Sequence, residues 1–326
     1  MASSLRCAVV GVGYLGRFHA QKYKAIEDVT LVGVSDHSTE RAKEVAAELG
    51  VLAFPNYKDL IGKVDAVTVA ASTQSHFEIA KFFLENGVHV NVEKPMTVTI
   101  EEGEELVRLA RVNKLKLQVG HVERFNPALQ AAQEKLKAPL FIECHRLAPF
   151  KTRGADVDVI LDLMIHDLDV VLSLVKSPVK SISAVGTPVL TKIVDIANAR
   201  LEFENGAIAN LTSSRVSQSA TRKFRVFQQS QYLSIDFGTG EVNLTTKTKG
   251  DWSGVDLNAG TGELPLEFDS WSLEKGDALL AETKAFVHSI KTNGPVVVSG
   301  EDGLTALRLA SEIQKEVYAR LARFET

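Results

Sequence analysis

Two short groups of residues in this sequence combine side chains that handle protons and charge. Glu93-Lys94-Pro95 closes the apolar run Val88 to Val92. Lys94 would then stand at the carboxyl end of a parallel strand, where ligands bind in open α/β sheets. The second group, Asp162-x-x-x-His166, places a carboxylate and an imidazole on one face of a helix. We interpret Lys94 as a cationic donor and the second group as a tuned acid/base pair.

Both groups also have simpler interpretations. Glu93 and Lys94 could be a solvated pair at the end of a strand that Pro95 stops, whereas a cis bond before Pro95 would aim Lys94 at a ligand. Asp162 and His166 could form a purely structural contact or part of a metal site. We expect no metal, because two ligands four residues apart are too few without further cysteine or histidine ligands.

A glycine-rich turn near the N-terminus predicts that a dinucleotide binds. Gly11-x-Gly13-x-x-Gly16 follows a strand pattern and precedes a helix pattern. The glycines allow a tight turn and a close approach of the backbone to a pyrophosphate, whose charge the helix N-terminus receives. The simpler interpretation is that these glycines only make a turn.

Asp36 indicates which dinucleotide is used. It ends the second predicted strand, where a carboxylate binds the ribose 2′-hydroxyl and repels a 2′-phosphate. We therefore predict that the cofactor is NAD. NADP stays as the less favoured alternative, because His37 and Arg41 could accommodate its 2′-phosphate. Asp36 could instead only cap the helix that follows it.

The other candidate residues follow strand ends or the junction after residue 120. Thr73 or Ser75 is also placed to cap a helix, and His76 could be a packing histidine. The predicted cofactor-binding residues are Gly11, Gly13, Tyr14, Leu15, Gly16, Asp36, Ser72, Thr73, His76, Glu93 and Lys94. The predicted substrate-binding residues are Lys94, His121, Arg124, Asn126, Lys151, Arg153, Asp162 and His166.

The first part of the chain alternates strand and helix patterns, which predicts a doubly wound parallel sheet, a Rossmann domain of the α/β class. The expected strands are Leu5 to Val10, Thr30 to Ser35, Val64 to Ala70, Val88 to Val92 and Leu115 to Val119. The expected helices between them are Tyr14 to Lys24, Thr39 to Leu49, Ser75 to Glu85 and Ile100 to Asn113.

The second part predicts an α+β domain with a large, open, mainly antiparallel sheet. Its strands are expected at 140–146, 179–186, 195–203, 207–215, 224–228, 232–236 and 241–245. Asn205-Gly206 predicts a tight hairpin. One helix is expected over 158–174 and a long loop over 246–270, and two further helices, 273–291 and 303–322, close the chain.

Length and composition bound the other expectations. At 326 residues the chain suits two domains, predicted as 1–123 and 124–326, with the C-terminal helices able to pack back on the first. Lys and Arg number 37 against 41 Asp and Glu, so no positive field favours nucleic acid. Two cysteines build no disulfide framework, and no segment resembles a membrane span or a secretion signal. We expect a cytoplasmic protein.

In this order, the motifs resemble those of the glucose-fructose oxidoreductase/inositol dehydrogenase (Gfo/Idh/MocA) family. The resemblance rests on Gly11 to Gly16, Glu93-Lys94-Pro95, Gly120 to Pro127 and Asp162-x-x-x-His166, and runs over essentially the whole chain. It implies a Rossmann domain joined to an open antiparallel sheet, NAD or NADP across the Rossmann strands, and substrate between the domains. On the matching positions, it implies that Lys94 binds the reacting hydroxyl and that Asp162 and His166 complete the catalytic group.

The resemblance implies a dehydrogenase that oxidises a secondary hydroxyl of a sugar or nucleotide sugar. Segments 120–127 and 162–175 look most like members that act on the 3-hydroxyl of UDP-N-acetylglucosamine. The alternatives are an inositol or free-sugar dehydrogenase, an NAD-using glycosidase and a non-catalytic NAD-binding regulator. Ala71-Ser72 replaces the Thr-Pro common in the family, which affects pocket shape. We expect a homodimer or homotetramer, because an exposed sheet face needs a cover.

Overall fold

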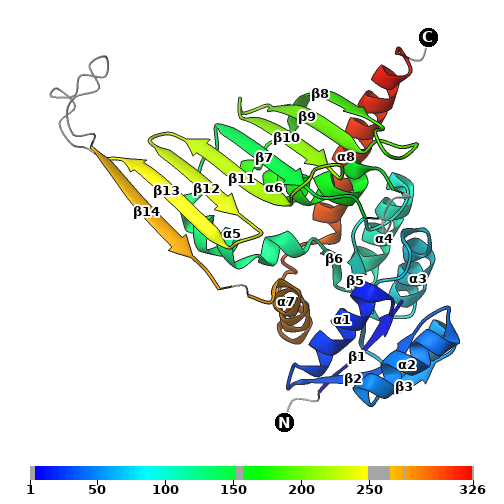
Figure 1. Cartoon of the computed structure of the whole chain (residues 1–326). Helices are drawn as coiled ribbons and strands as arrows, with labels where there is room; N and C mark the ends of the chain where they lie inside the picture. The colour runs from blue at the N-terminus through cyan, green and yellow to red at the C-terminus, as the bar shows by residue number, and fades with distance from the viewer. Residues whose placement is uncertain (1–3, 152–156, 249–264, 275, 325–326) are drawn as a thin grey trace, which may run out of the picture. The chain divides into compact units, whose positions relative to one another are not determined.

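The computed structural model describes residues 4–151, 157–248, 265–274 and 276–324 (Figure 1). The chain divides into two compact units. The first comprises Met1–Phe125 and Asp277–Leu309, and the second comprises Asn126–Gly276 and Ala310–Thr326. The domain limits expected from the sequence, 1–123 and 124–326, stay a prediction. No described helix is long and apolar enough to cross a membrane.

The first unit contains a six-stranded parallel sheet in the order β3-β2-β1-β4-β5-β6. The order reverses between β1 and β4, which confirms the predicted doubly wound fold and marks the switch point where such folds bind ligands. The strands are β1 Leu5–Val10, β2 Val29–Ser35, β3 Leu52–Phe54, β4 Ala66–Val69, β5 His89–Glu93 and β6 Leu117–Gly120. The sequence patterns did not predict β3, which has only three residues.

Helices cover both faces of this sheet, as its buried apolar strands require. They are α1 Tyr14–Lys24, α2 Thr39–Leu49, α3 Thr73–Glu85, α4 Ile100–Val112 and α7 Ala278–Thr292, with short 3-10 helices η1 Tyr57–Leu60 and η2 Val122–Phe125. Local chemistry fixes their ends. Thr99 and Glu102 form a reciprocal capping box at the start of α4. Phe286 and Val287 of α7 lie in the same hydrophobic cluster as Cys7 and Val9 of β1.

The second unit contains an eight-stranded sheet in the order β14-β13-β12-β11-β7-β10-β9-β8. Only β7 and β10 pair in parallel, so the predicted mainly antiparallel sheet is confirmed. The strands are β7 Phe141–Leu147, β8 Val179–Thr187, β9 Ile196–Phe203, β10 Ile208–Ser214, β11 Thr221–Gln228, β12 Gln231–Asp236, β13 Glu241–Lys247 and β14 Leu266–Ser272. Gly206 has a φ of 86° in the predicted hairpin turn between β9 and β10.

The predicted loop over 246–270 is wrong at both of its described ends, because β13 runs to Lys247 and β14 begins at Leu266. Leu266 to Ser272 form β14, whose Leu266 pairs with Lys247 of β13. Residues 249–264 of that loop lie outside the described residues. The sequence did not predict β14 because polar and charged residues interrupt its apolar positions, and the strand is largely exposed.

One face of the large sheet is covered by helices α5 Pro127–Ala132, α6 Ile165–Val175 and the end of α8 Gly300–Leu321 (Figure 1). Two short turns, η3 Gln133–Lys135 and the π-helix η4 Ile160–Met164, precede β7 and α6 respectively. Inward-facing residues alternate with exposed ones along β9, where Ala197, Ala199 and Leu201 are buried.

Candidate active site

The glycine turn between β1 and α1 leaves open space only at its middle glycine. Gly11 has a φ of 83°, and a β-carbon there would lie 2.4 Å from the nitrogen of Ala71. A β-carbon on Gly16 would lie 1.8 Å from the carbonyl oxygen of Gly11. A β-carbon on Gly13 would meet no described atom within 4 Å. The turn therefore fits a dinucleotide pyrophosphate, which needs close approach of the backbone at the N-terminus of α1.

A cavity of about 890 Å³ opens beside this turn. Its volume is typical of a ligand site, and it lies where β1, β2 and β4 end. Of the predicted cofactor-binding residues, Gly11, Gly13, Asp36 and Ser72 line it. The others, Tyr14, Leu15, Gly16, Thr73, His76, Glu93 and Lys94, lie outside its lining, so direct contact of these residues with the cofactor stays a prediction.

Asp36 is fixed at the wall of this cavity by backbone donors. Its Oδ2 accepts a hydrogen bond from the N–H of Val12 at 2.7 Å, and its Oδ1 accepts one from the N–H of Ser38 at 3.0 Å. The cap of α2 is Ser38, whose Oγ accepts from the N–H of Arg41 at 3.3 Å. The alternative interpretation of Asp36 as a helix cap is therefore wrong. The Nε of Arg41 donates to the carbonyl oxygen of Val12 at 2.8 Å, which places a cation beside the same turn.

The start of α3 differs from its prediction. Ser72 occupies the N-cap position, with no side-chain bond to the helix backbone, and Thr73 is the first helical residue. The alternative interpretation, in which Thr73 or Ser75 caps the helix, is therefore wrong. His76 is buried, and its Nδ1 and Nε2 lie 3.0 and 3.1 Å from the carbonyl oxygens of Pro95 and Ala71. Burial lowers the pKa of His76, and a neutral imidazole carries one N–H, so it donates a hydrogen bond to only one of these two carbonyl oxygens at a time.

Lys94 follows directly after β5 and is half-buried. The bond between Lys94 and Pro95 is cis, which confirms that prediction. Glu93 is buried, so the alternative of a solvated Glu-Lys pair is wrong for this residue. Its Oε1 lies 2.7 Å from Nε2 of His19, and its Oε2 accepts the N–H of Lys94 at 3.2 Å. A buried carboxylate thus bonds the main chain of the candidate catalytic lysine.

The segment after β6 contains the next three predicted substrate-binding residues. His121 is buried, and burial together with the charge of Lys94 lowers the pKa of His121 to about 3, so it is neutral near pH 7. Arg124 donates through Nη2 to the carbonyl oxygen of Val297 at 3.3 Å. Asn126 caps α5 through Oδ1, which accepts the N–H of Ala128 at 3.0 Å. The substrate contacts of these three residues stay predictions.

Asp162 and His166 lie in the second unit, on a helix with an unusual first turn. The predicted single helix over 158–174 is a π-helix over residues 160–164 followed by α6. The N–H of Ile165 donates to the carbonyl oxygen of Ile160, five residues earlier. Such turns are rare and occur frequently at functional sites. Asp162 lies in this turn and His166 in the first turn of α6, and both are half-buried.

A buried ion pair anchors α6 to the large sheet immediately after His166. The Nε and Nη2 of Arg146, on β7, donate to Oδ2 and Oδ1 of Asp167 at 2.9 and 2.7 Å. Both side chains are about 5% exposed, and the paired geometry is the strong, orienting form of an Arg–carboxylate contact. Neither Arg146 nor Asp167 is among the site residues predicted from the sequence.

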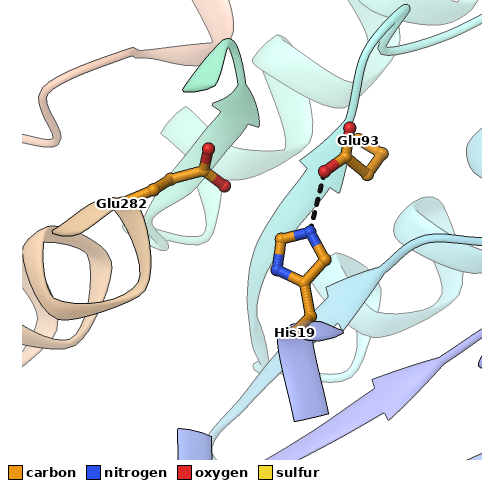
Figure 2. A group of neighbouring side chains, drawn as sticks. All are labelled: His19, Glu93 and Glu282. Carbon is orange, nitrogen blue, oxygen red and sulfur yellow. Dashed lines mark hydrogen bonds and ion pairs between the residues drawn. The ribbon is translucent and has the colours of Figure 1, made fainter. Parts of the chain in front are cut away.

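Two further residues beside Lys94 were also not predicted. His19 of α1 and Glu282 of α7 are buried. One ring nitrogen of His19, one carboxylate oxygen of Glu93 and one of Glu282 all lie within 4.8 Å of one another. Figure 2 shows the three side chains pointing toward one another from α1, β5 and α7. His19 could have been recognised as a polar residue on the buried stripe of α1 that contains Gly16, Ala20 and Tyr23. Glu282 had no local signal.

Two predicted substrate residues lie near the border of the described structure. Lys151 is exposed after β7. Arg153 lies outside the described residues. Thus the glycine turn, Asp36 and Lys94 belong to the first unit, and Asn126, Lys151, Asp162 and His166 belong to the second.

Comparisons with known proteins agree with this architecture. The chain is 40% identical to UDP-N-acetylglucosamine 3-dehydrogenase of Acidithiobacillus ferrooxidans over 320 residues, 98% of this chain and 99% of that protein. A solved structure of that enzyme matches with a TM-score of 0.89 over 98% of this chain and 99% of that chain, at 39% identity. The myo-inositol 2-dehydrogenase of Thermotoga maritima is 26% identical, with 96% of each chain covered.

Further similarities to known proteins extend over both units of the chain. A structure of scyllo-inositol dehydrogenase from Lactobacillus casei with bound NAD(H) and scyllo-inositol has the same fold, at 21% identity and a TM-score of 0.78 over 98% of each chain. Residues 5–121 match the oxidoreductase family with an NAD-binding Rossmann fold. Residues 143–233 match the GFO/IDH/MocA C-terminal domain. The chain is an oxidoreductase and belongs to the Gfo/Idh/MocA family.

Proposed function

We propose that this protein is an NAD-dependent dehydrogenase that oxidises the 3-hydroxyl of UDP-N-acetylglucosamine to a ketone. The observation that carries the proposal is the 40% identity, over nearly the full length of both chains, to a UDP-N-acetylglucosamine 3-dehydrogenase. The inositol dehydrogenase among its relatives supports the same class of reaction, oxidation of a ring hydroxyl.

Lys94 is proposed to bind the reacting hydroxyl. Its ammonium group donates to the hydroxyl oxygen and stabilises the negative charge that develops there as the proton leaves. A preorganised donor of this kind contributes on the order of 3 kcal/mol to transition-state stabilisation. The backbone bond from Lys94 to the buried Glu93 supports this role, because it fixes the main chain from which the side chain extends.

His166 is proposed to accept the proton of the same hydroxyl. When the O–H bond breaks, its proton passes to the imidazole; the C–H bond pair leaves carbon as hydride, and the C=O bond forms. Bound NAD supplies the hydride acceptor. Imidazole is suited to the proton transfer because it titrates near neutral pH. Asp162, four residues earlier, orients the imidazole and stabilises its charged form.

NAD is proposed as the preferred cofactor over NADP. The support is the position of Asp36, whose carboxylate lines the cavity at the end of β2 and is held by two backbone donors. In Asp36→Ser, repulsion of a 2′-phosphate is lost while Arg41 remains beside the turn. We expect the ratio of kcat/KM for NAD over NADP to fall about tenfold or more. An unchanged ratio would contradict the role of Asp36, and the exposed Asp59→Asn is the matched control.

The substrate phosphates need cations, and we propose Arg124, Lys151 and Arg153 for this purpose, with His121 and Asn126 as contacts to the sugar. A substrate without phosphates, such as an inositol, would gain less from contacts with these cations. The charge-reversing variants Lys151→Glu and Arg153→Glu should therefore raise KM for a UDP-sugar and leave KM for NAD unchanged.

A homodimer or homotetramer is also proposed. Phe227 and Phe268 on the large sheet are 36% and 73% exposed, and Phe227 stacks between Phe141 and Tyr232 at centroid distances of 5.4 and 4.8 Å. An apolar, one-sided antiparallel sheet is suited to pairing with a second copy. Light scattering is the test, and a monomer would contradict this assembly.

The direct test of the activity is an NAD-reduction screen over UDP-N-acetylglucosamine, other UDP-sugars, free hexoses and inositols. We expect NADH to form fastest with UDP-N-acetylglucosamine. A higher kcat/KM for a free inositol would replace the nucleotide-sugar assignment. Measuring free sugar in the same reactions separates the alternatives, because an NAD-using glycosidase releases sugar without net NADH, and a regulator forms neither.

A further inference from the structure

A buried group of three titratable side chains lies directly behind the main chain of Lys94. His19 and Glu282 are 0% exposed and Glu93 is 7% exposed. Nε2 of His19 lies 2.7 Å from Oε1 of Glu93 (Figure 2). The other oxygen of Glu93 accepts the N–H of Lys94. A chain of contacts therefore runs from the imidazole of His19 through one carboxylate to the backbone of the reacting lysine.

The structure is shaped to hold the Glu93 carboxylate in this position. Glu93 pairs with Gly120 across β5 and β6, and a β-carbon on Gly120 would lie 3.0 Å from the carboxyl carbon of Glu93. That distance is shorter than an ordinary contact, so the glycine leaves the space that the carboxylate fills. The position is thus set by packing as well as by hydrogen bonds.

Glu282 faces the same group with fewer bonds than a carboxylate can accept. Its Oε1 accepts from Nδ2 of Asn91 at 3.2 Å, and Nε2 of Gln118 donates to its backbone oxygen at 3.3 Å. Its Oε2, like Nδ1 of His19, is buried without a hydrogen-bond partner among the described residues. A carboxylate in this setting lacks the donors that normally stabilise its negative charge.

The charges of the group follow from this arrangement. Burial would raise the pKa of Glu93, but the hydrogen bond and charge of His19, followed by the charge of Lys94, hold the pKa below its usual value. Burial would lower the pKa of His19, but Glu93 outweighs it and raises that pKa. Burial and the charge of Glu93 raise the pKa of Glu282 to about 7. Glu93 and His19 are thus an ion pair near neutral pH, and Glu282 is the group that gains or loses a proton.

Titratable groups on the elements next to α7 are included in this balance. Lys22 lowers the pKa of His19, and His76 contributes to the low pKa of Glu93. The groups on the neighbouring elements are Cys7 of β1, His19, Lys22 and Tyr23 of α1, Glu93 of β5, His121 after β6, and Glu123 and Arg124 of η2. Within the group of three, Glu282 is the carboxylic acid whose pKa is raised toward neutrality, so it is the proton-exchanging member.

We propose that Glu282, His19 and Glu93 form a positioning site for Lys94, in which Glu93 fixes the lysine main chain, His19 fixes Glu93, and proton exchange at Glu282 changes the charge that Lys94 experiences. None of the three side chains touches the substrate in this account. The catalytic part of the proposal rests on the proposed function, because it assigns the reacting hydroxyl to Lys94. The electrostatic part depends only on the geometry of the first unit.

The electrostatic part is tested without substrate by labelling lysines with ¹³C-dimethyl groups, which keep the positive charge, and following the Lys94 resonance by NMR. The Lys94→Arg variant assigns the signal. We expect the resonance to shift with a midpoint near pH 7 in the unmodified sequence and to lose that transition in Glu282→Gln. The matched control Glu301→Gln, an exposed acid in the first turn of α8, should keep it. The same transition in Glu282→Gln would overturn the proposal.

The positioning part is tested by comparing two replacements of His19. In His19→Gln the amide Nε2 can still donate to Glu93, whereas His19→Ala removes the donor. With the best substrate of the screen, we expect His19→Ala to lower kcat at least tenfold with NAD affinity retained, and His19→Gln to restore kcat to within about threefold. His89→Ala, at the other end of β5, is the control. Equal losses in both His19 variants would overturn the positioning role.

The two levels of the proposal fail in different ways. Absence of NADH with every UDP-sugar would contradict the proposed function, while the Lys94 resonance would still decide whether Glu282 acts on that lysine. If His19→Ala does not fold, the proposal is tested by the pH dependence of the Lys94 resonance in Glu282→Gln and by the kcat of His19→Gln. One equivalent of a divalent metal in the purified protein, bound through His19, Glu93 and Glu282, would overturn the proposal, because a metal would replace the exchanging proton.

Discussion

The supports behind Lys94 and behind His166 are both buried and charged, but they differ in composition. Behind His166, one guanidinium and one carboxylate, Arg146 and Asp167, match in number and geometry. Behind Lys94, two carboxylates, Glu93 and Glu282, share one imidazole. The first support has fixed charges over the physiological pH range, since an arginine does not titrate there. The second contains a proton whose presence depends on pH.

This difference assigns different tasks to the two supports. A closed, compensated pair resists change, because removal of either partner leaves a buried charge alone. The Arg146–Asp167 pair therefore acts as an anchor for α6. The carboxyl group of Glu282 lacks a hydrogen-bond partner at Oε2 among the described residues, so it can gain a proton without breaking a hydrogen bond there. The group of His19, Glu93 and Glu282 therefore responds to pH and to charge near Lys94. In the proposed function, the helix with the acid/base pair is anchored by fixed charges, whereas Lys94 is supported by a group that exchanges a proton.

The largest effect is expected from breaking the anchor. Asp167→Asn removes one charge of the buried pair and leaves Arg146 uncompensated, which should lower the free energy of unfolding by about 3 to 5 kcal/mol. Urea denaturation measures this loss. The exposed Glu204→Gln in the same unit is the control and should change stability little. A loss below about 1 kcal/mol for Asp167→Asn would remove the contrast between the two supports.

The next effect concerns catalysis at the end of the tunable support. Lys94→Ala removes the proposed donor to the hydroxyl oxygen and should lower kcat about a hundredfold or more, because such a donor acts mainly in the transition state. NAD affinity, measured by fluorescence titration of NADH, should remain nearly unchanged. Lys284→Ala, an exposed lysine of α7, is the control. Normal turnover in the Lys94 variant would end its catalytic role.

The smallest effect is the pH dependence of stability. The pKa of Glu282 is about 7 in the folded protein, above the ordinary value of 4.5. The folded state therefore holds this proton more tightly, and the stability that Glu282 contributes is full below about pH 4.5 and is lost as the pH rises through 7. The loss amounts to at most about 1.4 kcal/mol per pH unit.

Comparison with Glu282→Gln isolates this contribution, because glutamine does not titrate. The difference in unfolding free energy between the unmodified protein and the variant should decrease as the pH rises from about 5 to about 7. Urea denaturation at each pH measures it. A constant difference over this range would show that Glu282 exchanges no proton, and both supports would then be of the fixed-charge kind.

The sequence predicted those features that depend on neighbouring residues. The glycine turn, the strands of the parallel sheet and the cis bond at Pro95 follow from periodicity and motif, and the structure confirms them. The strands β3 and β14 were not predicted, because they lack a clear local pattern. β3 has only three residues, and β14 has no clear apolar alternation. Local patterns also could not show that Ser38, rather than Asp36, caps α2.

The supports themselves depend on contacts between distant segments. Glu282 reaches Asn91 only because α7 returns to the first unit after the whole second sheet has been formed. Arg146 reads in the sequence as one more charged residue of a strand, and its burial becomes evident only when α6 covers β7. A single sequence therefore predicts the catalytic candidates Lys94 and His166 better than the residues that hold them.

The central claim is that the enzyme removes hydride from carbon 3 of UDP-N-acetylglucosamine and delivers it to NAD. The most direct measurement uses substrate with deuterium at that carbon and determines the isotope content of the NADH formed by mass spectrometry. One deuterium is expected in each NADH molecule. NADH without deuterium would show that another position is oxidised, and the absence of NADH would contradict the dehydrogenase assignment.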